Sequence, residues 1–249
     1  MPHDHAIQCI HDPLLVMLSY LVSVLGSFTA LQLAIAIPAA RGAQRWRAIF
    51  AAGAAMGGGA IWAMHFIAML ACQMQIPVTY DLSITIASAV IAIVSCMAGL
   101  AIASAGVFGW SKLIVAGIFM GLGVTGMHYS GMAAMRMPAD IHYDTTLVLA
   151  SGAIAIVASI VALWLAFNLR GWLQMLGSAL VMGVAVCGMH YTGMLAASFA
   201  PNQAGAAALA GGISGGNLGM GIFAVTTLLL ATVLALSMMR QRQRAAVQI

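Results

Sequence analysis

The chain alternates between long apolar stretches and short polar segments. A membrane-spanning helix needs about 20 consecutive apolar residues, because each residue rises about 1.5 Å and the hydrocarbon core is about 30 Å thick. Seven stretches meet this requirement, and none contains Asp, Glu, Lys or Arg in its interior. The seven predicted spans cover residues 14–37, 48–71, 82–105, 113–135, 145–167, 172–199 and 218–239. The pattern therefore predicts an all-α membrane protein with seven transmembrane helices.

Composition supports this prediction. Hydrophobic residues make up 63% of the 249 residues and charged residues only 6%, whereas soluble domains carry about 25% charged residues. A chain with so few charges cannot cover its surface with polar groups, so the lipid bilayer must be its main partner. The net charge of +4 is spread over short loops and the C-terminal tail, which excludes a nucleic-acid partner. The four cysteines form no CxxC pair and indicate little about the redox compartment.

The charged residues predict how the protein lies in the membrane. Eight of the nine basic residues fall on one side: Arg41, Arg45, Arg47, Lys112, Arg170, Arg240, Arg242 and Arg244. Arg136 and all five acids fall on the other side, the acids being Asp4, Asp12, Asp81, Asp140 and Asp144. Because cytoplasmic loops are enriched in Lys and Arg, we expect the N-terminus outside the cytoplasm and the C-terminus inside it.

A two-helix unit recurs three times along the chain. The segment Met64–Met69 recurs as Met127–Met132 and Met189–Met194, and its histidines are 63 and 62 residues apart. An Asp that precedes a Ser by seven residues also recurs, in the pairs Asp12 and Ser19, Asp81 and Ser88, and Asp144 and Ser151. These repeats predict three parallel units, about 11–72, 80–136 and 143–200, and a seventh helix at 218–239. We expect the first six spans to form a pseudo-threefold ring with His65, His128 and His190 facing its interior.

The repeated motif combines imidazole with thioether. Residues four apart share one face of a helix, so each motif His lies over the Met four residues later. Imidazole suits several transition metals, and thioethers select Cu(I). The predicted metal ligands are His65, His128, His190, Met64, Met69, Met127, Met132, Met189 and Met194. Hydrogen bonds that merely hold the helices together are the alternative role for these histidines.

Serine and aspartate side chains are predicted to support the histidines. Ser19, Ser88 and Ser151 lie about two helical turns into their spans, close to the expected depth of the histidines. A ligating His usually donates its second N–H to an acceptor, so we expect at least one of these serines to hydrogen-bond a motif His. The alternative acceptors are Asp12, Asp81 and Asp144, which in the simpler interpretation cap helix N-termini.

The three motifs resemble the MHYT domain, a family of bacterial membrane sensors. The resemblance covers nearly the whole chain and implies one seven-helix domain over residues 1–244, with 240–249 as a cytoplasmic tail or linker. The first copy departs from the motif because Phe66 stands where Tyr is expected. The resemblance implies a multi-pass protein of the bacterial inner membrane that binds copper, as Cu(I), through the motif His and Met residues. It also implies a sensor of oxygen, carbon monoxide or nitric oxide, or of copper, without catalytic activity of its own. Signals would then pass to a cytoplasmic GGDEF, EAL or other output domain.

Two other functions remain open from the residues alone. Three histidines near Asp and Ser could form an intramembrane zinc hydrolase, although Met is a poor zinc ligand and the chain has no Glu to act as a base. A copper carrier or channel is the other alternative, but no polar path leads from the histidine layer to the cytoplasm. If the protein is a sensor, we expect the seventh helix to carry the signal inward, packed against spans one and six.

Overall fold

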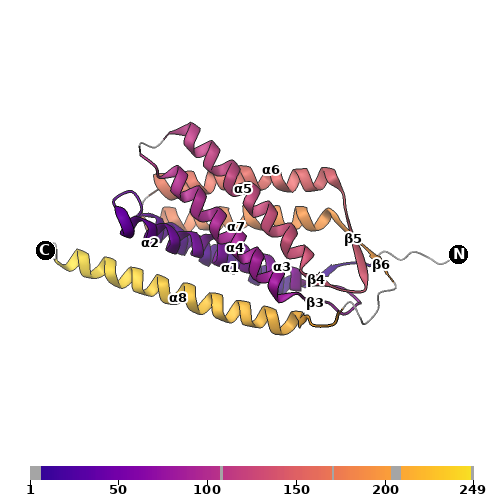
Figure 1. The fold of residues 1–249 in the computed structure, drawn as a ribbon. Helices are drawn as coiled ribbons and strands as arrows, with labels where there is room; N and C mark the ends of the chain where they lie inside the picture. Colours follow the sequence, from indigo (N-terminus) through magenta and orange to yellow (C-terminus); the bar gives the residue numbers. More distant parts are fainter. Residues whose placement is uncertain (1–6, 107–108, 170, 203–208, 248–249) are drawn as a thin grey trace.

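The computed structural model describes residues 7–106, 109–169, 171–202 and 209–247, and within them seven helices are long and apolar enough to cross a membrane (Figure 1). Six of them are α1 (Pro13–Ala34), α4 (Leu82–Ala103), α5 (Trp110–Ala133), α6 (Thr145–Asn168), α7 (Trp172–Leu195) and α8 (Gly215–Val247). The remaining one is continuous through α2 (Gly42–Gly53), η1 (Ala54–Trp62) and α3 (Ala63–Ala71). The predicted all-α membrane fold is therefore confirmed. Asp4, Arg170 and residues 248–249 lie outside the described residues.

The composite second span contains an unpredicted π-helix, η1. Three consecutive glycines, Gly57 to Gly59, lie within it, and a side chain at Gly57 would collide with the backbone of Ala92 on α4. The glycines therefore let η1 pack directly against the neighbouring helix. A π-helix is bonded from residue i to i+5, so each turn accommodates about one residue more than an α-turn.

Six of the seven spans form a closed ring. Neighbours around the ring are α1, the η1–α3 segment, α4, α5, α6 and α7, and α7 packs back against α1. The predicted ring of spans one to six is thus confirmed. The helix α8 lies outside it and contacts α1, η1 and α3 (Figure 1). The expectation that α8 would pack against spans one and six is confirmed for span one and wrong for span six, because glycines on the contact surface, such as Gly59 beneath Leu230, let α8 approach span two instead.

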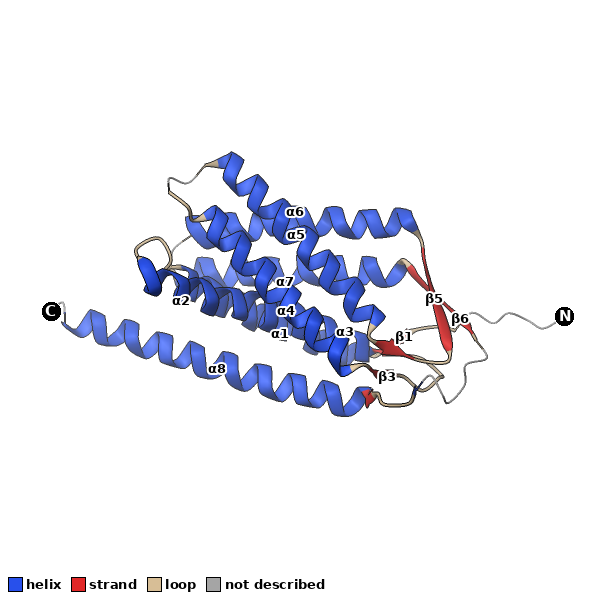
Figure 2. Ribbon diagram, viewed as in Figure 1, coloured by secondary structure: helices blue, strands red, loops and turns tan. Residues whose placement is uncertain are grey.

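Short antiparallel strands gather at one end of the bundle, called the strand end below (Figure 2). The pairs are β1 (Ile10–His11) with β2 (Cys72–Gln73), β3 (Thr79–Tyr80) with β4 (Met135–Arg136) and β7 (Ile213–Ser214), and β5 (Ala139–Tyr143) with β6 (Ala197–Pro201). In each repeat, the strand before the first helix pairs with the strand after the second helix, which closes the two-helix unit. The sixth span ends at Leu195, four residues before the predicted boundary, because β6 follows it.

The three repeated aspartates cap helices, as the simpler interpretation predicts. Asp12, Asp81 and Asp144 each accept backbone N–H bonds from the first turn of the helix that follows. Their own backbone N–H groups donate to the carbonyls of Ala71, Ala134 and Ala196, at 2.8, 2.8 and 2.9 Å. Each aspartate therefore joins the start of one helix to the end of its partner in the same repeat.

Arg136, the basic residue on the acidic side of the chain, has a clear partner. It forms an ion pair with Asp81 and donates to the carbonyl of Ala210 at 2.8 Å. The hydrogen bond from Arg136 holds the pKa of the Asp81 carboxyl below its ordinary value. The exception in the charge distribution is thus a local structural pair at the strand end.

A disulfide between Cys9 and Cys72 was not predicted from the sequence. It lies beside the β1–β2 pair and links residues 63 apart, across the whole first repeat. The equivalent positions of the other repeats hold apolar residues, Val78 with Met135 and Ile141 with Ala197. The cross-link is therefore specific to the first repeat.

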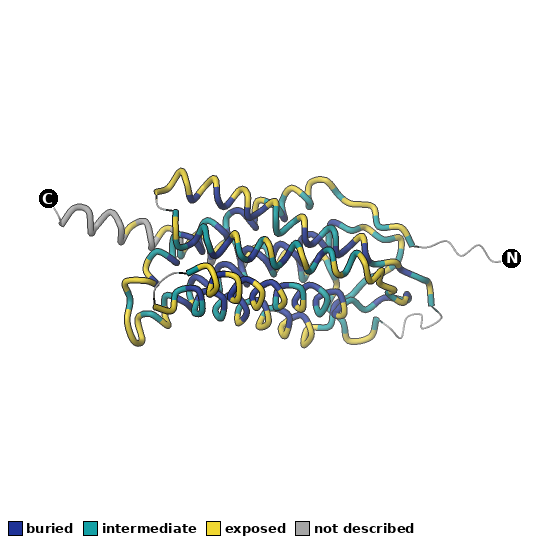
Figure 3. Tube along the Cα trace, turned by 90° about the horizontal axis from the view of Figure 1, so that it is seen from above, coloured by how far each residue is buried: buried dark blue, intermediate teal, exposed yellow. Residues whose placement is uncertain are grey.

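Buried residues lie toward the interior of the ring and exposed residues toward its outside (Figure 3). Many of the exposed residues are large and apolar. Leu149 and Val184, for example, are 69% and 61% exposed, as expected for side chains that face lipid. Two apolar cores fill the interior, one toward the strand end and one toward the opposite end, here called the loop end. The histidines lie between them.

Candidate metal centre

Each motif histidine lies near the strand end of its helix. His65, His128 and His190 precede the last residues of α3, α5 and α7 by six, five and five residues. For His128 and His190 this is shallower than the predicted span ends at residues 135 and 199 imply, because α5 and α7 give way to a strand before the apolar run ends. All three lie at one level of the bundle, about 8 Å from the helix ends.

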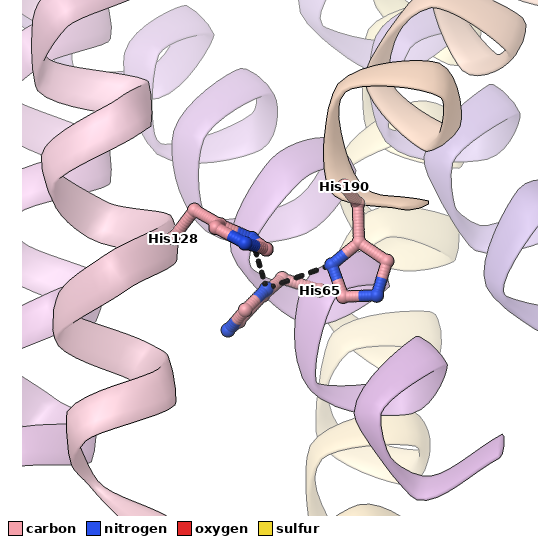
Figure 4. Close-up of side chains that lie close together, drawn as sticks. All are labelled: His65, His128 and His190. Carbon is pink, nitrogen blue, oxygen red and sulfur yellow. Dashed lines mark hydrogen bonds between the residues drawn. The ribbon is translucent and has the colours of Figure 1, made fainter. Parts of the chain in front are cut away.

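The three imidazoles converge in the centre of the ring (Figure 4). All three are completely buried. The Nδ1 atom of His65 lies 3.0 Å from Nδ1 of His190 and 3.2 Å from Nδ1 of His128. One nitrogen from each ring falls within a group whose members all lie within 4.8 Å of one another. The prediction that the motif histidines face the interior is confirmed.

The converging nitrogens fit a small metal ion. Nitrogens bound 2.0–2.1 Å from a metal in tetrahedral or trigonal geometry lie about 3.3–3.6 Å apart, so the separations of 3.0 and 3.2 Å from His65 need to widen only slightly. Among the described residues, the cluster includes no carboxylate. Its ligands would be neutral, and the cost of burying an ion rises steeply with its charge. The three histidines could therefore hold a metal ion.

The far nitrogens of two of the rings, those of His65 and His128, pack against glycines of the motifs. Nε2 of His65, His128 and His190 is buried in each case without a hydrogen-bond partner among the described residues. A side chain at Gly131 would collide with Nε2 of His65, and one at Gly193 would collide with Nε2 of His128. The motif glycines thus hold the rings so that their Nδ1 atoms point to the centre.

Two of the three repeated serines bond aromatic residues instead of the histidines. Trp62 donates its Nε1–H to Ser88 at 3.0 Å, and the Tyr129 hydroxyl bonds Ser151 at 2.8 Å. Ser19 donates to the carbonyl of Val16, as the other two serines donate within their own helices. Within the described residues no hydrogen bond joins these serines to a motif His, so that prediction is wrong. The observed bonds tie the first repeat to the second and the second to the third.

The motif methionines lie on both sides of the histidine layer. All six are buried. Met127 and Met189 belong to the core toward the loop end, whereas Met69, Met132 and Met194 belong to the core toward the strand end. Thioethers are therefore available above and below the three imidazoles.

Comparison with known proteins agrees with this architecture. The family model for the MHYT repeat, the "bacterial signalling protein N terminal repeat", matches residues 58–116, 121–179 and 183–248. MucR of Pseudomonas aeruginosa, a bifunctional diguanylate cyclase/cyclic di-GMP phosphodiesterase, is 38% identical over 240 residues, which cover 94% of this chain and 35% of the relative. The cyclic di-GMP phosphodiesterase NbdA of the same organism is 37% identical over 197 residues, covering 76% of this chain and 25% of the relative.

The signaling protein YkoW of Bacillus subtilis is also similar, at 31% identity over 205 residues that cover 80% of this chain and 25% of the relative. The chain thus spans about a third or less of the length of these relatives. No solved structure shows a significant match to the chain. The three matched repeats and the seven spans lead to one conclusion: the chain belongs to the MHYT family of bacterial signalling proteins and is a multi-pass protein of the bacterial inner membrane.

Proposed function

We propose that this chain is a sensory module that holds copper, as Cu(I), in the centre of its helical ring. His65, His128 and His190 are the proposed ligands, and the motif methionines on either side are available to complete the coordination. The proposal rests on the convergence of three buried Nδ1 atoms, two pairs of which lie 3.0 and 3.2 Å apart. Bound copper would supply a soft centre able to take a diatomic ligand such as oxygen, carbon monoxide or nitric oxide.

The surrounding residues suit such a centre. The apolar cores on both sides exclude water from the three imidazoles. Gly131 and Gly193 fix the rings by close contact. The bonds from Trp62 to Ser88 and from Tyr129 to Ser151 connect the motif helices to their neighbours. A displacement of one imidazole would therefore be passed to the adjacent helix of the ring.

The contact between α3 and α8 offers a route out of the ring. Leu70, five residues after His65 on α3, lies against Gly215 and Gly219 at the start of α8. Farther along, Leu230 of α8 packs on Gly59 of η1, 2.8 Å from the position of an added side chain. The helix that carries His65 thus touches α8 on both sides of the histidine layer, and we propose that α8 transmits the change.

We further propose that the strand end faces the periplasm and that α8 leads toward the cytoplasm. The distribution of basic residues supports this orientation. The Cys9–Cys72 disulfide supports it as well, because disulfides persist in oxidising compartments outside the cytoplasm. The proposed module covers residues 1–244, with 240–249 as a linker. The names of MucR and NbdA support a GGDEF or EAL output domain as the partner, where any catalysis would reside.

Metal content tests this proposal. The chain would be purified without chelators and its copper compared with that of a His65→Ala/His128→Ala/His190→Ala variant. A His11→Ala/His142→Ala variant serves as the matched control, because these two histidines lie outside the cluster. We expect the cluster variant to lose copper and the control to retain it. Unchanged copper in the cluster variant, or zinc as the retained metal, would contradict the assignment.

The transmission step has its own test. Spin labels would be placed at the loop end of α8 and in residues 41–47, and their separation measured with and without copper, then with gas added to the copper-loaded protein. We expect the separation to change on at least one of these additions. A constant distance would leave α8 as a membrane anchor only.

A further inference from the structure

A cavity of about 40 Å³ lies between α1, η1, α5, α6 and α7, on the loop-end side of the histidine layer. Four methionines line it: Met56 from η1, Met120 from α5, and Met182 and Met189 from α7. All four are buried, and the first three lie outside the repeated six-residue motif, whereas Met189 belongs to it. The cavity therefore borders the histidine layer at Met189 and extends from there toward the loop end to the other three methionines.

The three methionines occupy equivalent positions in the three repeats. Met120 and Met182 each precede their motif histidine by eight residues, and Met56 precedes His65 by nine. A branched apolar residue, four positions before each histidine, also lines the cavity: Ile61, Val124 and Val186. The cavity thus follows the pseudo-threefold symmetry of the ring.

The extra residue in the first repeat is absorbed by η1. Met56 and Ile61 are five residues apart, whereas Met120 and Val124, like Met182 and Val186, are four apart. Residues four apart share a face of an α-helix, and residues five apart share a face of a π-helix. Because η1 covers both Met56 and Ile61, the π-helix brings the thioether of Met56 to the same level as the other two.

A polar atom also lines this cavity. Ser27 of α1 is completely buried, and its hydroxyl oxygen has no hydrogen-bond partner among the described residues. A buried hydroxyl without a partner is costly, and this one borders the space that the three thioethers share. The cavity thus combines the three equivalent thioethers of Met56, Met120 and Met182, and that of Met189, with one unpartnered oxygen.

We propose that this chamber is a second binding site for a soft monovalent cation, Cu(I) or Ag(I), held by Met56, Met120 and Met182. Thioethers select Cu(I) over harder ions. The chamber contains no charged side chain among its lining residues, which favours a monovalent ion over a divalent one. Eight helical residues rise about 12 Å, so the backbone positions of Met120 and Met182 lie about that far from those of His128 and His190, whereas Met189 brings the other end of the chamber beside the histidine layer. The site does not require that the histidine cluster bind metal.

Cu(I) titration under reducing, oxygen-free conditions tests this proposal on the whole chain. The wild type would be compared with Met56→Leu/Met120→Leu/Met182→Leu and with His65→Ala/His128→Ala/His190→Ala, all against a competing chelator. The matched control is Met137→Leu/Met175→Leu, which replaces two buried methionines outside the chamber. Leucine keeps nearly the same volume and is well tolerated in packed interiors.

The expected result is two tightly bound ions in the wild type and the control, and one in each triple variant. X-ray absorption of the ion left in the histidine variant should show sulfur neighbours without imidazole nitrogen. Wild-type binding by the chamber triple variant would overturn the second site, whatever the histidine variant does. Loss of binding in the chamber variant alone would uphold this site and contradict the copper site at the histidines.

The single variant Met182→Leu tests the proposal even if the triple variant misfolds. It retains two of the three thioethers, and we expect at least a tenfold weaker affinity at one of the two sites with wild-type helix content. Unchanged affinity at both sites in this folded variant would also overturn the proposal.

Discussion

The first repeat differs from the other two in how it builds the same site. In the second and third repeats the motif histidine lies on an unbroken α-helix and is followed by Tyr129 or Tyr191. In the first repeat the helix passes through the π-helix η1, and Phe66 follows the histidine. All three imidazoles nevertheless reach the same centre. The three imidazoles therefore reach equivalent positions from repeats that differ in sequence and in helix type.

Compensation explains how the first repeat keeps those positions. The extra residue between Met56 and Ile61 is absorbed by one π-helical segment. The hydroxyl missing at Phe66 is replaced by the Nε1–H of Trp62, which bonds Ser88 as Tyr129 bonds Ser151. Each departure is thus offset by a neighbouring feature of the same helix.

The asymmetric attachments also gather on the first repeat. The disulfide spans it, and the helix α8 packs on its η1 and α3 segments. The other two repeats contribute mainly to the ring itself. The first repeat is therefore the part of the ring through which a change at the centre would reach α8.

The largest expected effect comes from deleting a single residue, either from the π-helix η1 or from the α-helix α5. Deleting Gly58 restores the eight-residue spacing from Met56 to His65 that the other repeats have, so η1 should become regular α-helix and the fold should survive. Deleting Gly123 from α5 would rotate the preceding turns by about 100° and misplace Met120. We expect the first variant to be folded and the second to be lost or aggregated, as judged by size-exclusion chromatography and circular dichroism. Equal damage in both would mean that η1 does not compensate for the inserted residue.

Removal of the Cys9–Cys72 disulfide should have the next largest effect. Replacing Cys9 and Cys72 by Ser removes a cross-link over 63 residues, which should lower the free energy of unfolding by about 2–4 kcal/mol. Thermal unfolding in detergent would measure the loss. Its counterpart is Val78→Ser/Met135→Ser, at the equivalent positions of the second repeat, where only apolar contacts are removed. If the cysteine variant is no less stable than the wild type, the cross-link does not stabilise the first repeat.

Alanine substitution of the glycines that contact the imidazoles should have the third largest effect. Alanine at Gly131 or Gly193 collides with a histidine ring, and such overpacking typically costs about 1–3 kcal/mol. Gly126 and Gly188 have open space around an added side chain, so alanine at these positions provides the matched controls. We expect lower melting temperatures and weaker Cu(I) retention only for the first pair. Equal behaviour of both pairs would show that the rings are not held by these glycines.

Much of the fold was predictable because the sequence patterns that indicate it extend over many residues. Seven apolar runs define the spans, and the repeat of 62–63 residues predicts that His65, His128 and His190 meet in the ring. The strands could not be predicted, because most contain only two residues and show no alternation. The π-helix has one faint signal, the five-residue spacing from Met56 to Ile61, whose meaning depends on knowing that both side chains line one cavity.

The serine prediction failed for a local reason. Ser151 lies at the right depth, but its hydroxyl proton goes to the carbonyl of Val148, and its remaining acceptor capacity is used by Tyr129. Tyr129, the residue after His128, therefore bonds the serine in place of the histidine. Spacing along the chain predicts depth in the bundle well, whereas the choice of hydrogen-bond partner depends on side-chain directions that spacing does not contain.

The smallest expected effect concerns these hydroxyl contacts. Tyr129→Phe removes one hydrogen bond to Ser151 and should cost about 0.5–1.5 kcal/mol. Phe66→Tyr adds a hydroxyl in the first repeat, where Trp62 already occupies Ser88, so it should bring no gain and leave a buried polar group poorly paired. Tyr143→Phe is the control, because its side chain is 39% exposed and its hydroxyl can bond water. Melting temperatures of the three variants would measure the differences. A Phe66→Tyr variant that is more stable than the wild type would show that Trp62 does not substitute for the missing tyrosine. The hydrogen bond from Trp62 to Ser88 would then not be equivalent to the bond between Tyr129 and Ser151.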